Sequence, residues 1–167
     1  LLNTITPQPK EIHDVTYGAG SFYQHCPNLQ IHAADIKKWP WVTTPTTFNQ
    51  TDALTYITKL PNEGSQNRII VIDPPYPTRP TSNSRHYEWL YYPKPWTYTY
   101  LMTTLRNARI KAETVILKYM SDKNEEAKLT TIADYVVMWR FIKPHIPAKN
   151  NIVIRNTSKI FILTRKH

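Results

Sequence analysis

The sequence predicts one α/β domain over residues 1–167, built on a mostly parallel sheet with one antiparallel strand near its C-terminal edge. Short apolar runs alternate with helical segments along the chain, as in β–α–β units, so we expect parallel strands with helices on both faces. The last two apolar runs have no helical pattern between them, and such a connection favours antiparallel pairing. A length of 167 residues also suits a single compact domain.

Strands are expected where short apolar runs end at turn residues or acids. They cover residues 11–16, 29–34, 68–73, 114–119, 135–142 and 159–164, and a further strand should end just before Asp52. The run at 68–73 gives the clearest strand. A continuous apolar run bounded by turn signals is typical of a strand that is buried on both faces of a sheet.

Three helices are expected between the strands. The first covers residues 51–59, and the second covers residues 96–110 with Pro95 placed to start it. The third covers residues 122–133, with Ser121 as its N-cap and acidic residues near its start. The segments left over are predicted to form an N-terminal tail, a long proline-rich loop and a basic loop, at residues 1–10, 77–95 and 143–158.

Charge is distributed unevenly along the chain. Residues 1–83 carry six basic and six acidic residues, whereas residues 84–167 carry fifteen basic and six acidic residues. All of the net charge of +9 therefore lies in the second half. Such a half favours a polyanionic partner, with nucleic acid first, although a solvated basic surface would have the same composition.

Composition excludes several classes of protein. The single cysteine, Cys26, excludes an internal disulfide. No run approaches the ~18 consecutive apolar residues of a membrane span, and residues 1–10 lack the pattern of a signal peptide. We therefore expect a cytoplasmic protein without a membrane partner, in the host cytoplasm if the source is viral. The six histidines show no metal-ligand spacing, so no metal site is predicted.

Two glycines follow the first expected strand, in the stretch DVTYGAG at residues 14–20. Glycines at such a turn let the backbone approach a nucleotide closely, although an ordinary tight turn has the same pattern. Asp35 ends the second strand, where an acid accepts hydrogen bonds from ribose hydroxyls, is solvated, or caps a helix. Asp52 either meets an adenine amino group or caps the helix that it opens.

The most specific signal is the stretch VIDPPY at residues 71–76, which follows a buried strand. The Asp73 carboxylate accepts one hydrogen bond, and the carbonyl of Pro74, which has no N–H of its own, accepts another. Two rigid acceptors can hold both hydrogens of an exocyclic amino group and direct its lone pair outward. Tyr76 offers a face for base stacking, worth roughly 1–3 kcal/mol. A proline-rich strand exit without a ligand is the alternative.

These stretches resemble the class I S-adenosylmethionine (SAM)-dependent methyltransferases of the DPPY type, which modify exocyclic amino groups of adenine or cytosine in DNA. Some relatives act on RNA. The glycine motif precedes DPPY, and the later runs at residues 116–120 and 155–162 are similar to stretches in small phage-encoded members. The resemblance implies a Rossmann-like fold, SAM as cofactor, and methylation of a base amino group in DNA, with adenine N6 first and cytosine N4 second.

The resemblance also implies roles for individual residues. It places Asp14, Gly18 and Gly20 beside the methionine part of the cofactor, with Asp35 at the ribose and Asp52 near the adenine. The cofactor-binding residues that it implies are Asp14, Thr16, Tyr17, Gly18, Gly20, Asp35, Asp52 and Asp73. The catalytic residues that it implies are Asp73, Pro74, Pro75 and Tyr76. No strong general base is required, because the sulfonium is already a strong electrophile.

Cations and aromatic rings alternate in the expected loop at residues 77–95. Such a loop suits a flipped or single-stranded base, because cations meet phosphates while rings stack on bases, although some rings will pack in the core. Lys118 ends the fifth strand and either meets phosphate or substrate or pairs with an acid. The substrate-binding candidates are Arg79, Arg85, Tyr87, Trp89 and Lys118. A second strip, either contacting a nucleic-acid backbone or solvated, comprises Lys143, His145, Lys149, Arg155 and Lys159.

Two other functions fit the same sequence. One is an RNA base methyltransferase acting on ribosomal or transfer RNA, because a structured RNA can be read by its shape. The other is a catalytically inactive, methyltransferase-like subunit that binds nucleic acid inside a larger assembly. Since no separate target-recognition domain is visible, a partner subunit would supply target recognition.

Overall fold

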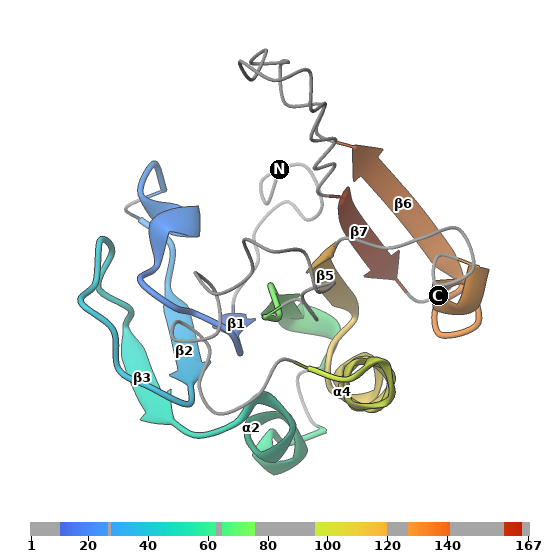
Figure 1. Ribbon diagram of the computed structural model, residues 1–167, viewed down its shortest axis with the longest axis horizontal. Coiled ribbons are helices and arrows are strands. Elements are labelled where there is room, and N and C mark those ends of the chain that lie inside the picture. The colour runs from blue at the N-terminus through green and yellow to red at the C-terminus, as the bar shows by residue number, and fades with distance from the viewer. Residues whose placement is uncertain are drawn as a thin grey trace, which may run out of the picture.

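Seven strands form one sheet within the residues that the computed structural model describes, which are 11–26, 28–62, 65–75, 96–119, 127–140 and 159–164. The strand order is β3-β2-β1-β4-β5-β7-β6 (Figure 1). Strands β1 to β5 pair in parallel, and β7 runs antiparallel to both β5 and β6. The predicted α/β fold, with one reversed strand near the C-terminal edge, is confirmed.

The strands are β1 (Glu11–Asp14), β2 (Ile31–Asp35), β3 (Thr47–Gln50), β4 (Arg68–Ile72), β5 (Thr114–Tyr119), β6 (Tyr135–Arg140) and β7 (Lys159–Thr164). The helices are α2 (Ala53–Lys59) and α4 (Tyr98–Lys111), and two short 3-10 turns are η1 (Ser21–Tyr23) and η2 (Ser65–Asn67). Most predicted strands agree with these bounds to within two residues.

Both long helices begin later than predicted, because capping side chains set their starts. The Asp52 carboxylate accepts a hydrogen bond from the backbone N–H of Thr55 at 2.9 Å, so α2 begins after it. The Thr97 hydroxyl accepts from the backbone N–H of Tyr100 at 3.2 Å, so Thr97, and not Pro95, marks the start of α4.

The predicted helix at residues 122–133 ends earlier than expected. Of its described part, residues 127–129 are helical and residues 130–132 form a turn. The hydroxyls of Thr130 and Thr131 donate to backbone carbonyls three residues earlier, at 2.6 Å and 2.7 Å. Such side-chain bonds compete with helix continuation, which accounts for the early end. The predicted cap, Ser121, lies outside the described residues.

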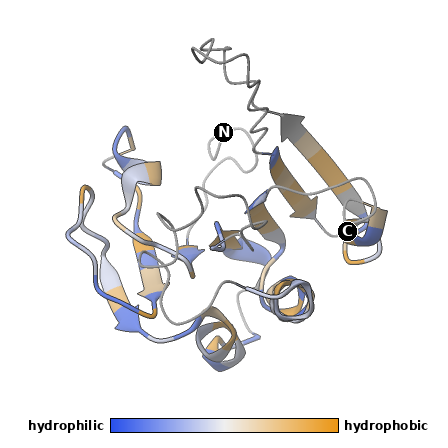
Figure 2. Ribbon diagram, viewed as in Figure 1, coloured by the Kyte–Doolittle hydropathy of each residue, from blue (hydrophilic) through white to orange (hydrophobic). Residues whose placement is uncertain are grey.

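The core lies on both faces of the sheet because every residue of β4 is buried. Alternate residues of a strand face opposite sides, so Ile70 packs in one cluster with Leu105 of α4, whereas Val71 packs in a second cluster with Tyr23 of η1. Figure 2 shows hydrophobic residues along the strands and mixed character on α2 and α4.

Helices cover the two faces of the sheet unequally. Helices α2 and α4 lie side by side against the first cluster, whereas the second is covered by η1 and its neighbouring loops (Figure 1). Helices were expected on both faces. Among the described residues, the first face carries α2 and α4, whereas the second face carries only the 3-10 turn η1. The segment after β1 carries Gly18 and Gly20 at positive φ, which ends regular structure there. No described helix is both long and apolar enough to cross a membrane.

Replacing Leu105 by alanine should lower the free energy of unfolding by about 2–5 kcal/mol, because the side chain is fully buried between α4 and the sheet. Ile110 on the same helix is 56% exposed, so Ile110→Ala should change the free energy of unfolding by less than about 0.5 kcal/mol. Urea unfolding of both variants measures the contrast. Equal losses would contradict the packing of α4 described above.

Candidate functional site

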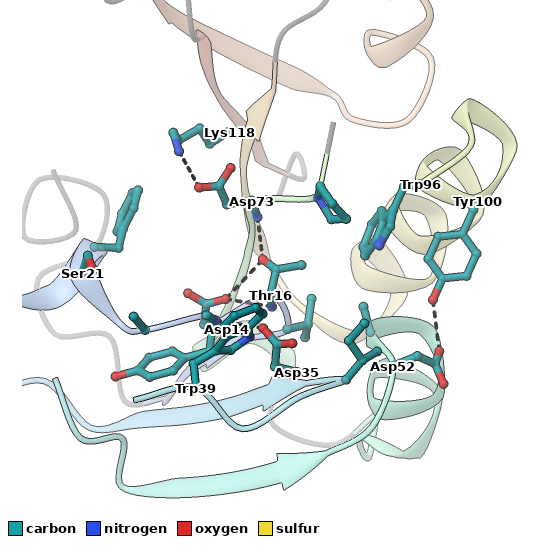
Figure 3. Close-up of a pocket in the computed structure, with 18 of the residues that line it drawn as sticks. Asp14, Thr16, Ser21, Asp35, Trp39, Asp52, Asp73, Trp96, Tyr100 and Lys118 are labelled. Atoms are coloured by element: carbon teal, nitrogen blue, oxygen red, sulfur yellow. Dashed lines mark hydrogen bonds and ion pairs between the residues drawn. The ribbon is translucent and has the colours of Figure 1, made fainter. Parts of the chain in front are cut away.

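A pocket of about 800 Å³ lies at the carboxyl ends of the parallel strands, a size suited to a small ligand (Figure 3). The chain runs outward from β1 through β2 to β3 and then returns to the other side of β1 to form β4, and open α/β sheets bind ligands at such a switch point. Its polar lining residues come from the ends of successive strands and from α4: Asp14, Thr16, Ser21, Asp35, Asp52, Asp73, Thr97, Tyr100 and Lys118.

The glycine turn after β1 forms one wall of this pocket. Gly18 has φ 57°, lines the pocket, and donates its backbone N–H to Asp35 Oδ2 at 2.9 Å. Gly20 has φ 73° but is not among the lining residues. A Cβ at position 20 would lie 2.5 Å from the Tyr17 hydroxyl oxygen and 2.8 Å from the Thr43 carbonyl oxygen. Gly20 therefore permits close packing of the turn.

Asp14 is a buried carboxylate at the floor of the pocket, with 3% of its surface exposed. Its oxygens accept hydrogen bonds from the Thr16 backbone N–H at 2.9 Å and from the Tyr23 hydroxyl at 2.8 Å. Burial raises the pKa of Asp14 to about 7, the nearby Asp73 charge adds to the rise, and these hydrogen bonds oppose it. Burial also raises the pKa of Tyr17 to about 12.

Two further acids lie along the same rim of the sheet. Asp35 ends β2, and Asp52 lies between β3 and α2. Asp35 accepts backbone hydrogen bonds from Gly18 and, at 3.2 Å, from Lys37. Asp52 caps α2 and also accepts from the Tyr100 hydroxyl at 3.0 Å. Burial works against ionisation of Asp52, but the hydrogen bonds to it prevail and lower its pKa. Asp52 thus caps the helix, as one of the two sequence alternatives expected, and also lines the pocket.

Asp73 follows β4 and is held from two directions (Figure 3). Its backbone N–H donates to the Thr16 hydroxyl at 2.6 Å, and its carboxylate Oδ2 accepts from the Lys118 ammonium. The Thr16 hydroxyl in turn donates to Asp14 Oδ1 at 3.3 Å. Asp73, Thr16 and Asp14 therefore form one hydrogen-bonded chain across the ends of β1 and β4.

The structure brings most predicted site residues into this pocket. Its lining includes Asp14, Thr16, Tyr17, Gly18, Asp35, Asp52, Asp73, Pro75 and Lys118. Pro74 is buried and, like Gly20, is not among the lining residues. The predicted residues outside the described part of the chain are Tyr76, Arg79, Arg85, Tyr87, Trp89, Lys143, His145, Lys149 and Arg155.

Lys159 does not belong to a solvated or backbone-contacting strip, as the sequence suggested. It begins β7 and is 8% exposed, because pairing with both β5 and β6 encloses that strand. Among the described residues, no three His, Cys, Asp or Glu side chains are placed to hold a metal ion.

Sequence reasoning missed the aromatic and apolar lip of the pocket. Phe22, Ile36 and Trp39 line it, and the first two are 42% and 43% exposed. The Lys37 ammonium lies 4.4 Å from the centroid of the Trp39 ring, a cation–π contact. The basic and aromatic stretch IKKWPW directly after Asp35 was the available signal. The lip gives the pocket a surface on which a flat ring could pack.

Trp96 closes the pocket on the side of α4. It packs edge-on against Tyr100, with ring centroids 4.8 Å apart, and its backbone N–H donates to the Pro75 carbonyl at 3.3 Å. The sequence placed Trp96 at the start of the second expected helix, and the structure puts it on the pocket wall, two residues before α4 begins. The pocket thus combines strand-end carboxylates, one lysine and aromatic walls. This combination can bind a ligand that carries amino groups, hydroxyls and a flat ring.

The chain matches no protein-family model and no curated protein sequence. Solved structures do share its fold. A SAM-dependent methyltransferase from Agrobacterium tumefaciens has a TM-score of 0.62 at 16% identity, over 96% of this chain and 57% of that one. A protein from Streptococcus mutans described as a methyltransferase, in complex with SAH, has a TM-score of 0.55 at 11% identity, over 92% of this chain and 88% of that one.

An rRNA methylase from Streptococcus thermophilus has a TM-score of 0.51 at 9% identity, over 93% of this chain and 87% of that one. At these identities the likeness concerns the fold. The predicted Rossmann-like fold of class I methyltransferases is confirmed.

Replacing Asp14 by asparagine should change how stability depends on pH. Between pH 3.8 and about 7 the folded chain keeps the Asp14 proton that the unfolded chain releases, so this carboxyl destabilises the fold increasingly as pH rises. The free energy of unfolding of the wild type, relative to Asp14→Asn, should fall by about 1.4 kcal/mol per pH unit within that window.

Urea unfolding of both proteins between pH 4 and pH 8 measures this difference. Above about pH 7 the difference should become constant, because Asp14 is then ionised in both states. A difference that does not vary with pH would mean that the Asp14 carboxyl titrates normally.

Proposed function

We propose that this chain transfers a methyl group from SAM to an exocyclic amino group of a base in DNA, adenine N6 first and cytosine N4 second. One observation carries the proposal. Asp73, followed by Pro74 and Pro75, stands at the end of β4 in the same pocket as Gly18 and Asp35. A carboxylate that can hold an amino group therefore lies in one pocket with a glycine turn and an acid suited to a nucleoside.

The residues around the glycine turn fit the proposed cofactor. The positive φ of Gly18 lets its backbone approach a ligand closely, and the Asp35 carboxylate beside it suits ribose hydroxyls. Asp52 lines the same pocket and would meet the adenine amino group, while Ile36 and Trp39 would offer apolar surface to the adenine ring. Two solved structures of the same fold are described as SAM-dependent or as holding SAH.

The proposed chemistry requires positioning more than acid–base catalysis. SAM would supply an electrophilic methyl group on a sulfonium sulfur. Asp73 would accept a hydrogen bond from the target amino group and orient the nitrogen lone pair toward the methyl carbon. Thr16 fixes the backbone of Asp73, and Lys118 fixes its carboxylate. The new N–C bond would form as the bond between the methyl carbon and the sulfonium sulfur breaks, which would leave SAH, and the amino proton would then pass to solvent.

Nucleic acid is proposed as the substrate from charge. The net charge of +9 lies in the second half of the chain, and such an excess of basic residues suits contacts with phosphates. An RNA base is the second candidate, because one solved structure of this fold is described as an rRNA methylase. A cytoplasmic location and a partner subunit for target recognition belong to the same proposal.

Asp73→Ala should lower kcat at least about a hundredfold, the size of effect seen when one group that stabilises a transition state is removed. The variant should still bind SAM, because the proposed cofactor contacts lie at the glycine turn and Asp35. Asp35→Ala should show the opposite pattern, with weakened SAM binding.

Mass spectrometry of nucleosides after incubation with SAM and either DNA or RNA measures methylation, and calorimetry measures SAM binding. The identity of the methylated nucleoside distinguishes DNA from RNA and adenine from cytosine. Loss of SAM binding in Asp73→Ala would instead assign Asp73 to the cofactor pocket. Failure of the wild-type chain to bind SAM would favour the catalytically inactive alternative.

Binding to duplex DNA should weaken steeply with salt. Each phosphate contact contributes about −0.9 to the slope of log affinity against log salt concentration. A protein that makes four such contacts would therefore show a slope of about −3.6. Fluorescence anisotropy of the whole chain with a labelled duplex, at several salt concentrations, gives this slope. A flat response would remove the charge argument for nucleic acid.

A further inference from the structure

Asp73 and Lys118 sit side by side at the rim of the sheet. Strands β4 and β5 are parallel, with Ile72 opposite Leu117, so the next residue of each strand occupies adjacent rim positions. The Lys118 ammonium donates to Asp73 Oδ2, and both side chains line the pocket (Figure 3). The Lys118 side chain is 33% exposed and the Asp73 side chain is 30% exposed. The pair therefore presents a hydrogen-bond donor directly beside a hydrogen-bond acceptor.

The strand order places this pair at one end of the pocket. Asp14, Asp35 and Asp52 come from β1, from β2 and from the residue before α2, whereas β5 lies on the other side of β4. If the cofactor occupies the side of the glycine turn, as proposed above, Lys118 lies on the side of Asp73 from which the target base would approach. Stability does not require the pair, since partly exposed ion pairs contribute little to it.

This donor–acceptor pair can distinguish bases by the hydrogen-bonding groups on their edges. Adenine and cytosine each carry an amino group beside a ring nitrogen that accepts hydrogen bonds, N1 in adenine and N3 in cytosine. On the same edge of guanine, the ring nitrogen beside the amino group is a donor, which would face the lysine unfavourably. A carboxylate for the amino group and an ammonium for the ring nitrogen therefore match the edge that adenine and cytosine share.

We propose that Lys118 is a specificity-determining residue that donates a hydrogen bond to the ring nitrogen beside the target amino group, while Asp73 accepts from the amino group itself. This inference rests on the proposed function. It adds which edge of the target base the site recognises, namely the edge that carries the amino group and the neighbouring ring nitrogen. Lys118 thereby restricts methylation to bases with an amino group next to a ring acceptor. It also holds Asp73 in place when no base is bound.

The test uses target bases that lack only the ring acceptor. The target adenine is replaced by 1-deazaadenine, or the target cytosine by 3-deazacytosine, according to which natural base the wild type methylates. The wild type should use the deaza base with a kcat/KM about tenfold to a hundredfold lower, because the base then offers no ring acceptor to the Lys118 ammonium. Lys118→Met should lower kcat/KM on the natural base and bring the ratio of the two bases close to that of their intrinsic reactivities.

Three further variants control the experiment. Lys118→Arg and Lys118→Gln each retain a donor and should keep part of the preference. Lys128→Met removes the same charge from an exposed lysine outside the pocket, and should leave the ratio unchanged. Because the intrinsic reactivity of each deaza base is the same for every variant, only the change in ratio between variants is informative. Calorimetry with SAM and the urea midpoint report whether each variant is folded.

The outcomes separate this inference from the proposed function. Methylation of the natural base with a wild-type ratio in Lys118→Met overturns the inference alone. A fall of both bases by the same factor, together with a shallower salt slope, assigns Lys118 to a phosphate and also overturns it. If Lys118→Met does not fold, a ratio equal to the wild-type ratio in both Lys118→Gln and Lys118→Arg overturns it. Absence of methylation of either natural base overturns the proposed function, and this inference with it.

Discussion

The site depends on one threonine hydroxyl that joins two strands. Thr16 donates to the buried Asp14 carboxylate and accepts from the Asp73 backbone N–H, so the ends of β1 and β4 are held at a fixed spacing. Tyr23 anchors Asp14 from the opposite side. Because a hydroxyl can donate and accept at once, threonine or serine can make this bridge and valine cannot. The glycine turn and the rim of β4 therefore behave as one unit.

The electrostatics of the pocket contrast with those of the chain as a whole. Four carboxylates, on Asp14, Asp35, Asp52 and Asp73, line a pocket in a protein of net charge +9. Within the described residues, the first three are oriented by backbone N–H or hydroxyl donors, and Asp73 additionally pairs with a lysine. Acidic side chains therefore gather at the pocket, which suits a cationic cofactor, while basic residues elsewhere suit a polyanion. This separation agrees with the two proposed ligands.

The sequence predicted the parts of the molecule that local signals determine. Continuous apolar runs located β4 and β5, and the rule that strand ends share one edge brought Asp73 to the glycine turn. The start of α4 was missed because both Pro95 and Thr97 are acceptable starts, and a hydrogen bond decides between them. Trp39 was missed because its loop has no periodicity and is fixed by bonds to the turn at Ala19. The pairing of Asp73 with a lysine depends on which strands are neighbours, which periodicity does not reveal.

The missing side chain of Gly20 has an influence that extends beyond its own turn. The Tyr17 ring lies so near that even a methyl group at position 20 would displace it. Tyr17 stacks on Tyr23 with ring centroids 5.7 Å apart, and Tyr23 holds the Asp14 carboxylate. A series of contacts thus connects Gly20, which lies outside the pocket lining, through the rings of Tyr17 and Tyr23 to the Asp14 carboxylate. Because Tyr17 also lines the pocket, a side chain at position 20 would disturb both the wall of the pocket and the acid beneath it.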